Sequence, residues 1–211
     1  MRDFFASPEV QWPRQQRLHV YAVGTPELAE LFEAYHRELV TSGVAAEHGL
    51  GLQGPEWAHF TVQMLLRACD ELRPGQREAL EAELSRAVAS LPELTLRVGA
   101  ARGASQRAVE LAVEPGVDAE WMVMVTAVRR AVAGVLGEDA LPELGSNASP
   151  HTSIGYGTGD GDSGAITSVL NKVRRPVVEV PVTAVHLVAV TQHPERGCFT
   201  WEHLAELPLR H

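Results

Sequence analysis

Two short stretches, one in each half of the chain, constrain the fold more than any other feature. Each contains a His followed two positions later by a hydroxyl residue: His59 and Thr61 in the first, His151 and Ser153 in the second. In a β-strand, residues two positions apart point to the same face of the sheet. The pattern therefore predicts two strands that each present an imidazole and a hydroxyl group, and we expect both pairs to face one cleft.

A short His-x-Thr/Ser pattern also arises by chance. The structural alternative is a pair of half-buried strand histidines that hydrogen-bond to nearby hydroxyls. The shared context of the two stretches favours a common function, because an apolar residue follows each hydroxyl, Val62 in one case and Ile154 in the other, and both stretches have a strand-like composition. Their repetition in the two halves indicates a weak internal duplication.

At these positions the sequence resembles the 2H phosphoesterase superfamily and, within it, the bacterial 2′-5′ RNA ligase-like proteins. That family is defined by two His-apolar-Thr/Ser-apolar motifs, one per lobe, and here they are His59–Val62 and His151–Ile154, with Thr152 as a departure from the pattern. Some relatives have a basic residue five positions after the second His, where this chain has Tyr156. The resemblance implies a two-lobed α/β (α+β) fold with the active-site cleft between the lobes.

Composition and charge limit the partners of the chain. At 211 residues, 45% hydrophobic and 21% charged, it fits a single bilobal domain over residues 1–211, which we expect to be a monomer. The formal net charge of −9 argues against a grip on long duplex nucleic acid, which needs many basic contacts to phosphate. A small nucleotide or an RNA end is the expected partner, although Arg67, Arg97, Arg102 and Arg107 could form a local basic rim.

The location of the protein is inferred from its cysteines and its N-terminal sequence. Cys69 and Cys198 belong to no metal-binding or redox spacing and are interpreted as reduced structural thiols. The start of the chain lacks the apolar core of a signal peptide, and no apolar run reaches the length of a membrane span. These observations predict a cytoplasmic protein that does not associate with a membrane.

Hydrophobic periodicity predicts mainly antiparallel sheets flanked by helices. The chain begins with an irregular segment whose aromatic residues can pack on the body. Expected helices begin near Thr25, Pro74, Asp118 and Ala165 and end near Val40, Leu91, Leu136 and Val173. Expected strands lie at 18–23, 57–66, 94–98, 109–113, 177–190 with a break near Pro181, and 199–207; residues 99–106 are expected to form the loose tip of a hairpin.

Four further residues are candidates for contact with substrate. Gln63 lies two positions after Thr61 and is expected on the same strand face. Tyr156 occupies the position at which some relatives carry a basic residue. His19 and Tyr21 alternate along the first predicted strand and line the cleft if that strand lies beside the first motif; an ordinary strand face is the alternative.

A glycine- and aspartate-rich stretch, Gly157–Gly164, invites two metal or phosphate interpretations that the sequence does not support. Asn171 stands where a calcium loop needs a bidentate Glu, and the Gly-Lys-Ser/Thr end of a phosphate-binding loop is missing. We interpret the stretch as a flexible loop that could cap the cleft. No clustered His/Asp ligand set or His-Glu-x-x-His motif is present, so no metal or cofactor is expected and a His-rich metal enzyme is the weakest interpretation.

The leading hypothesis is a metal-independent phosphoesterase that acts on a 2′,3′-cyclic phosphate or on 2′-5′-linked nucleotide or RNA ends. One of His59 and His151 removes a proton from the attacking oxygen and the other protonates the leaving oxygen, a pair of roles that suits imidazole. Thr61 and Ser153 donate hydrogen bonds to the non-bridging phosphate oxygens. The alternative is a nucleotide- or RNA-end-binding module that has the same cleft and little turnover.

Overall fold

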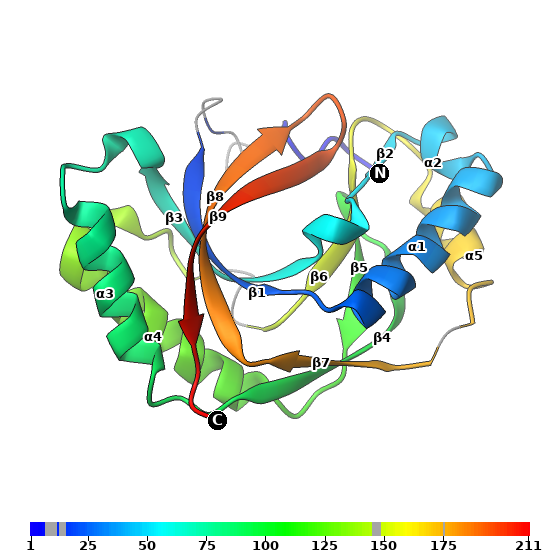
Figure 1. Ribbon diagram of the computed structural model, residues 1–211. Helices are drawn as coiled ribbons and strands as arrows, with labels where there is room; N and C mark the ends of the chain where they lie inside the picture. Colours follow the sequence, from blue (N-terminus) through cyan, green and yellow to red (C-terminus); the bar gives the residue numbers. More distant parts are fainter. Residues whose placement is uncertain (7–11, 13–15, 145–148, 175) are drawn as a thin grey trace.

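The computed structural model describes residues 1–6, 12, 16–144, 149–174 and 176–211 and shows two antiparallel sheets between two pairs of helices (Figure 1). The four-stranded sheet has the order β3 (His59–Ala68), β1 (Arg17–Val23), β8 (Ala184–His193) and β9 (Cys198–Pro208). The five-stranded sheet has the order β2 (Leu50–Leu52), β6 (Thr152–Gly157), β5 (Ala108–Val113), β4 (Leu94–Ala104) and β7 (Val178–Val182).

The helices are α1 (Pro26–Thr41), α2 (Val44–Glu47), α3 (Gln76–Val88), α4 (Asp118–Leu136) and α5 (Ser163–Leu170), and three short 3₁₀ turns are η1 (Pro55–Trp57), η2 (Cys69–Glu71) and η3 (Glu138–Ala140). The predicted α1 start is confirmed, because the Thr25 hydroxyl accepts a hydrogen bond from the Leu28 amide at 3.4 Å and Pro26 occupies the first turn. In α5 the corresponding cap is Asp162, whose carboxylate accepts from the Gly164 and Ala165 amides.

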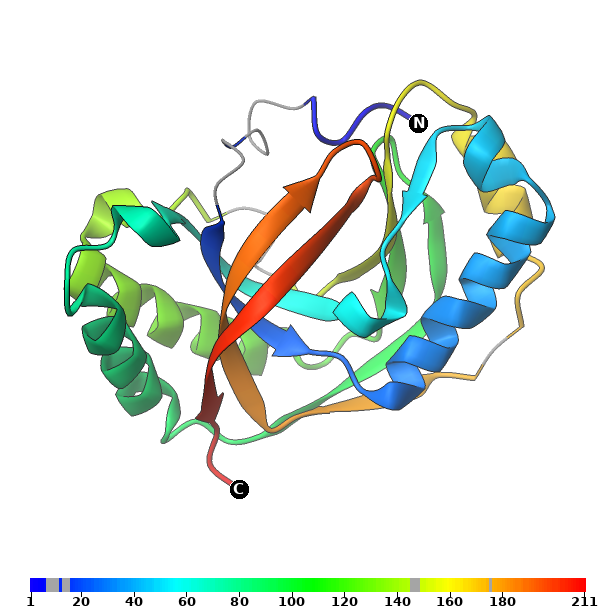
Figure 2. The same ribbon diagram turned by 45° about the horizontal axis from the view of Figure 1, so that its top comes forward.

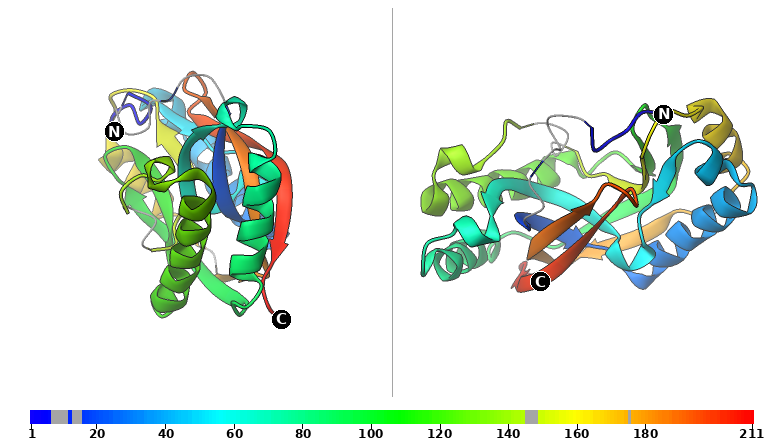
Figure 3. Two further views of the ribbon diagram at one scale, coloured as in Figure 1. Left: turned by 90° about the vertical axis from the view of Figure 1, so that its left-hand side faces the viewer. Right: turned by 90° about the horizontal axis from the view of Figure 1, so that it is seen from above.

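The helices exchange partners between the two halves of the chain. α1 follows β1 of the four-stranded sheet, yet it packs with α5 beside the five-stranded sheet; α4 follows β5 of the five-stranded sheet, yet it packs with α3 against β3. The two helix pairs lie at opposite ends of the molecule with the sheets between them (Figures 1 and 3). One continuous hydrophobic cluster includes side chains from both sheets and both helix pairs.

The expected two-lobed fold of antiparallel sheets is confirmed, but several boundaries differ from the sequence prediction. β4 continues to Ala104, so the expected loose tip at 99–106 is largely strand. Two register shifts against β5 accommodate this small-residue stretch. The break between the two strands falls at Thr183, where β7 ends and β8 has not yet begun. Pro181 lies inside β7, which is an edge strand and therefore tolerates a residue without an amide donor. The break coincides with the passage of the chain from one sheet to the other, visible in Figure 2.

Hydrogen bonds attach the Gly157–Gly164 stretch to two other segments of the chain, at Gly49 and at Met1. The Thr158 amide and hydroxyl both donate to the Gly49 carbonyl, and Gly161 exchanges hydrogen bonds with Met1. Asp162 in this stretch is a helix cap, so its carboxylate has a structural role. Residues 142–150, which lead into β6, lie partly outside the described residues.

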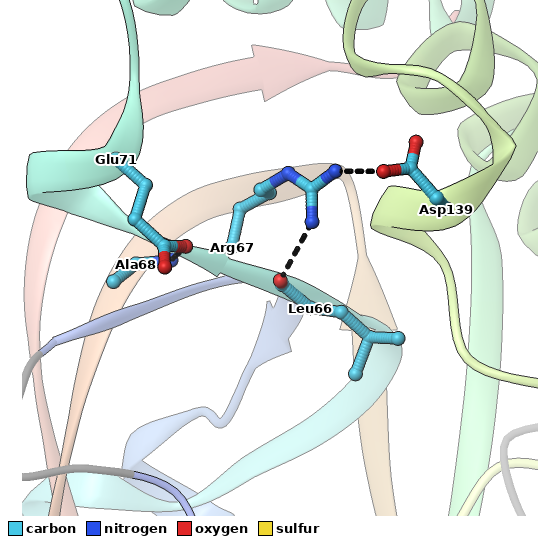
Figure 4. A network of polar contacts seen from close by, with 5 residues as sticks. All are labelled: Leu66, Arg67, Ala68, Glu71 and Asp139. Carbon is cyan, nitrogen blue, oxygen red and sulfur yellow. Dashed lines mark hydrogen bonds and ion pairs between the residues drawn. The ribbon is translucent and has the colours of Figure 1, made fainter.

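Polar contacts fix the C-terminal end of β3, which is far from the His59 motif (Figure 4). Arg67 forms an ion pair with Asp139 of η3 and donates to the Leu66 carbonyl, while the Glu71 carboxylate accepts from the Ala68 amide at 2.7 Å. These contacts join β3 to η3 and η2. None of the described helices is both long enough and apolar enough to cross a membrane.

Candidate active site

The two motif histidines are held in the same way. His59 Nδ1 lies 2.8 Å from the Trp57 carbonyl oxygen, and His151 Nδ1 lies 3.2 Å from the Ser149 carbonyl oxygen, in each case two residues upstream. A carbonyl oxygen can only accept, so each Nδ1 carries a proton and donates it. The neutral tautomer of both rings therefore leaves Nε2 as an unprotonated acceptor, which is the atom available for proton transfer.

Gln53, which the sequence did not single out, supports the carbonyl that holds His59. Its side-chain amide donates to the Trp57 carbonyl at 3.2 Å and to the Phe199 carbonyl at 2.9 Å, and its side-chain oxygen accepts from the Phe199 amide. The Gln53 backbone amide donates to the Ile154 carbonyl in the second motif. Through its fully buried side chain and its backbone amide, Gln53 thus joins the carbonyl that holds His59, the second motif strand and β9.

The two motif strands contact one another across the sheets, and His151 repels the positive form of His59. A Tyr accompanies each motif hydroxyl. Against the larger, opposite effect of burial, Thr61 lowers the pKa of the neighbouring Tyr21 phenol, and Ser153 lowers that of Tyr156. The Tyr21 ring also stacks on the His59 imidazole, with centroids 4.0 Å apart and planes 16° apart.

A β-bulge directly after each motif hydroxyl decides which residues join the site. Thr61 pairs with Tyr21 and Gln63 pairs with Val20, so Val62 is the extra residue. In the second motif, Ser153 pairs with Glu110 and Gly155 with Val109, which makes Ile154 the extra residue. Beyond a bulge the alternation of faces is reversed.

The reversed alternation brings Tyr156 to the Ser153 face, three residues after the hydroxyl. By the same geometry, Met64 and not Gln63 lies on the same strand face as Thr61 in the first motif. The expectation that Gln63 shares the face of Thr61 is therefore wrong. Gln63 is fully buried, and its side-chain oxygen accepts from Arg129 at 3.0 Å. Arg129 is partly buried and also donates to the Pro142 carbonyl.

Burial controls the protonation of the histidines on the four-stranded sheet. Desolvation lowers the pKa of His59 to about 4, with a further contribution from His151, against a partly compensating hydrogen bond to Trp57. Desolvation also lowers the pKa of His19, to about 3. Both rings are therefore neutral near neutral pH, whereas His151 is only partly buried.

The two tyrosines, Tyr21 and Tyr156, belong to a second, largely aromatic cluster. Its buried members are Phe5, Tyr21, Ala108, Tyr156, Val188, Val190 and Phe199, and Phe4, Trp12 and Trp201 pack against them. Phe4 and Phe5 come from the N-terminal segment, which is bonded to β6 through the Phe4 amide and the Gly157 carbonyl. His19 contacts this cluster through Trp12 and Tyr21, so both expected residues of β1 lie on the motif side of the sheet.

Two of the four arginines considered for a basic rim are engaged elsewhere. Arg67 is paired with Asp139 at the far end of β3. Arg97 forms ion pairs with Glu114 and Glu179 on the five-stranded sheet. The Arg102 side chain lies outside what the structure describes. Arg107 directly precedes β5, and its carbonyl accepts a hydrogen bond from the Gly157 amide.

Comparison with known protein families matches residues 26–194 to the 2′-5′ RNA ligase superfamily, a stretch that includes both motifs. The chain belongs to this superfamily. The resemblance to 2H phosphoesterases drawn from the motifs is therefore confirmed. No match was found among curated proteins.

Solved structures of low sequence identity share the fold. TT0787 of Thermus thermophilus aligns with a TM-score of 0.61 and 20% identity, covering 92% of this chain and 98% of its own. Escherichia coli LigT in apo form aligns with a TM-score of 0.62 and 15% identity, covering 94% and 100%. LigT complexed with 3′-AMP gives 0.62 and 17% identity, covering 93% and 99%.

The contacts of Gln53 generate a prediction about stability. Gln53→Leu keeps a side chain of similar volume but removes three hydrogen bonds to backbone groups of Trp57 and Phe199. Buried backbone groups without partners cost about 1–3 kcal/mol each, and partial relaxation should leave a total loss of about 3 kcal/mol in the free energy of unfolding. Urea denaturation measures this loss, with the exposed Gln106→Leu as the matched control. Equal losses in the two variants would contradict the role given to Gln53.

Proposed function

We propose that the protein is a metal-independent phosphoesterase that acts on 2′,3′-cyclic phosphate or 2′-5′-linked nucleotide or RNA ends by two-histidine acid–base catalysis. The observation that carries the proposal is the matched arrangement of His59 and His151. Each is locked by Nδ1 to the carbonyl two residues upstream, and each keeps Nε2 for proton transfer.

The different environments of the histidines support distinct roles for them in the proposed ring opening. His59 is neutral because burial lowers its pKa, so its Nε2 accepts the proton of the attacking water or ribose hydroxyl. His151 then donates a proton to the leaving oxygen. In the reverse reaction, which joins two ends, the same atoms exchange roles.

The Tyr–hydroxyl pairs supply the groups that stabilise charge on the phosphate. Burial raises the pKa of the Tyr21 and Tyr156 phenols, so both stay protonated and can donate to the neighbouring Thr61 and Ser153 hydroxyls, each of which keeps its own proton to donate. The non-bridging oxygens, on which charge develops in the transition state, are the acceptors of those protons. Tyr156 acts here as a positioning residue, through Ser153, where some relatives have a basic side chain.

A small phosphoester agrees with the charge of the chain and with its structural relatives. LigT has been crystallised with 3′-AMP and with ATP, which are small nucleotides. The net charge of −9 and the engagement of Arg67 and Arg97 with carboxylates disfavour a long nucleic-acid partner. A binding module with little turnover is distinguished by assay with nucleoside 2′,3′-cyclic monophosphates, because such a module would retain the nucleotide unchanged.

Replacement of either motif histidine tests the mechanism directly. His59→Ala and His151→Ala should each lower kcat by about 10²–10⁴-fold, the usual contribution of a positioned acid or base. Turnover of the cyclic monophosphates, with separation of the 2′- and 3′-phosphate products, provides the measurement. His211→Ala, in an exposed C-terminal residue, is the control. Near wild-type turnover in either motif variant would exclude that His from catalysis.

The low pKa of His59 predicts an unusual pH profile. For the free enzyme, kcat/KM should rise as His59 loses its proton near pH 4, well below the ordinary His value of about 6.5, and fall at higher pH as the general acid loses its proton. The rate should be measured from about pH 3.5 to 9, with circular dichroism at each pH to confirm that the protein is folded. An acidic limb near pH 6.5, or a flat profile, would contradict this assignment of the base.

The tyrosines should affect kcat more than KM. Tyr21→Phe and Tyr156→Phe keep the ring but remove the hydroxyl, and each should lower kcat by about 10-fold, less than loss of a direct donor to the developing charge. Because Tyr21 acts through Thr61, Thr61→Val should cost less in the Tyr21→Phe background than in the wild type. Independent, additive effects of the two substitutions would show that Tyr21 does not position Thr61.

A further inference from the structure

A cluster of metal-ligand side chains lies on β8 and β9, outside the groups assigned to the reaction. His186, His203 and Glu206 each offer one ligand atom, and these three atoms lie within 4.8 Å of one another. His186 Nδ1 is only 2.8 Å from His203 Nε2. His186 is half-buried, whereas His203 and Glu206 are exposed, so an ion could reach the cluster from solvent.

The cluster exists because β9 contains a bulge. His186 pairs with Glu206, and Val188 pairs with His203, so one extra residue of β9 is accommodated between these pairs. In a regular strand, residues three apart such as His203 and Glu206 would point to opposite faces. The bulge places both on the His186 face, and long antiparallel strands hold all three in position.

The close nitrogen pair suits a cation. Two imidazole nitrogens at 2.8 Å can share one proton, and a divalent ion can replace that proton while Glu206 supplies a negative charge. Zinc binds imidazole nitrogen at about 2.0–2.1 Å, which places two nitrogens of a tetrahedral set about 3.3 Å apart. Opening the pair by roughly 0.5 Å meets that geometry, within the range of a side-chain adjustment.

The residues that flank His186 across the sheet are Glu206 on β9 and Tyr21 on β1. The Glu206 carboxylate is the one anionic group among the three proposed ligands. Tyr21, the cross-strand neighbour of His186 on β1, presents a phenol whose pKa is raised and which therefore adds no charge.

We propose that His186, His203 and Glu206 form a binding site for a divalent transition-metal ion, with Zn²⁺ as the best match to two nitrogens and a carboxylate. Three protein ligands leave a fourth position for water. The site uses neither His59 nor His151, although His186 is the cross-strand neighbour of Tyr21. Its existence does not depend on the proposed function.

Calorimetric titration of the metal-stripped full chain with Zn²⁺ tests the site. The wild type should bind one equivalent, and His203→Ala should weaken binding by at least about 100-fold, because loss of a direct ligand should cost no less than the 10–100-fold typical of outer-sphere partners. Glu206→Gln should weaken it to a smaller extent. His211→Ala removes another exposed imidazole near a carboxylate, that of Glu93, and should bind like the wild type.

A second measurement excludes loss of folding as the cause. Zn²⁺ should raise the Tm of the wild type and of His211→Ala, but not that of His203→Ala, whose Tm without metal should be close to the wild-type value. Absence of binding at one equivalent by the wild type would overturn the proposal. Equal affinity in His203→Ala and the wild type, with or without a Tm shift, would also overturn it.

Discussion

The arrangement of the site depends on the hydrogen bonds of one buried amide, Gln53. Its side chain forms hydrogen bonds with the Trp57 carbonyl and with both polar groups of the Phe199 backbone. Its backbone amide donates to the Ile154 carbonyl. A buried polar side chain is stable only when its groups are paired, so Gln53 fixes the relative positions of all three segments at once. The Trp57 carbonyl that it holds is the same atom that fixes the His59 tautomer.

The second determinant is a pair of bulges at equivalent places in the two motifs. Val62 and Ile154 each follow a motif hydroxyl, and each interrupts the strand alternation there. In the second motif the interruption brings Tyr156 beside Ser153; in the first it turns Gln63 away toward Arg129. The two halves of the chain therefore share a backbone irregularity as well as the residue types of the motif.

Local patterns in the sequence were sufficient to predict much of the fold. Alternation located β1 and β3, and Thr25-Pro26 located the start of α1, because both signals depend on neighbouring residues alone. Strict alternation failed at Gln63, since a bulge is set by pairing with a strand distant in sequence. Gln53 carries no local signal at all, because its partners at Phe199 and Ile154 are brought near only by the folded chain.

The exchange of helices and strands between the halves has a consequence for the order of folding. β1, near the start of the chain, pairs on one side with β8, and α1 packs against α5. These N-terminal elements therefore cannot complete their contacts until the C-terminal part of the chain is present. Contacts of such long sequence separation slow folding, because a large loop must close before they form. During synthesis the four-stranded sheet can be completed only after β8 and β9 have left the ribosome, and until then one edge of β1 is open to pairing with other chains.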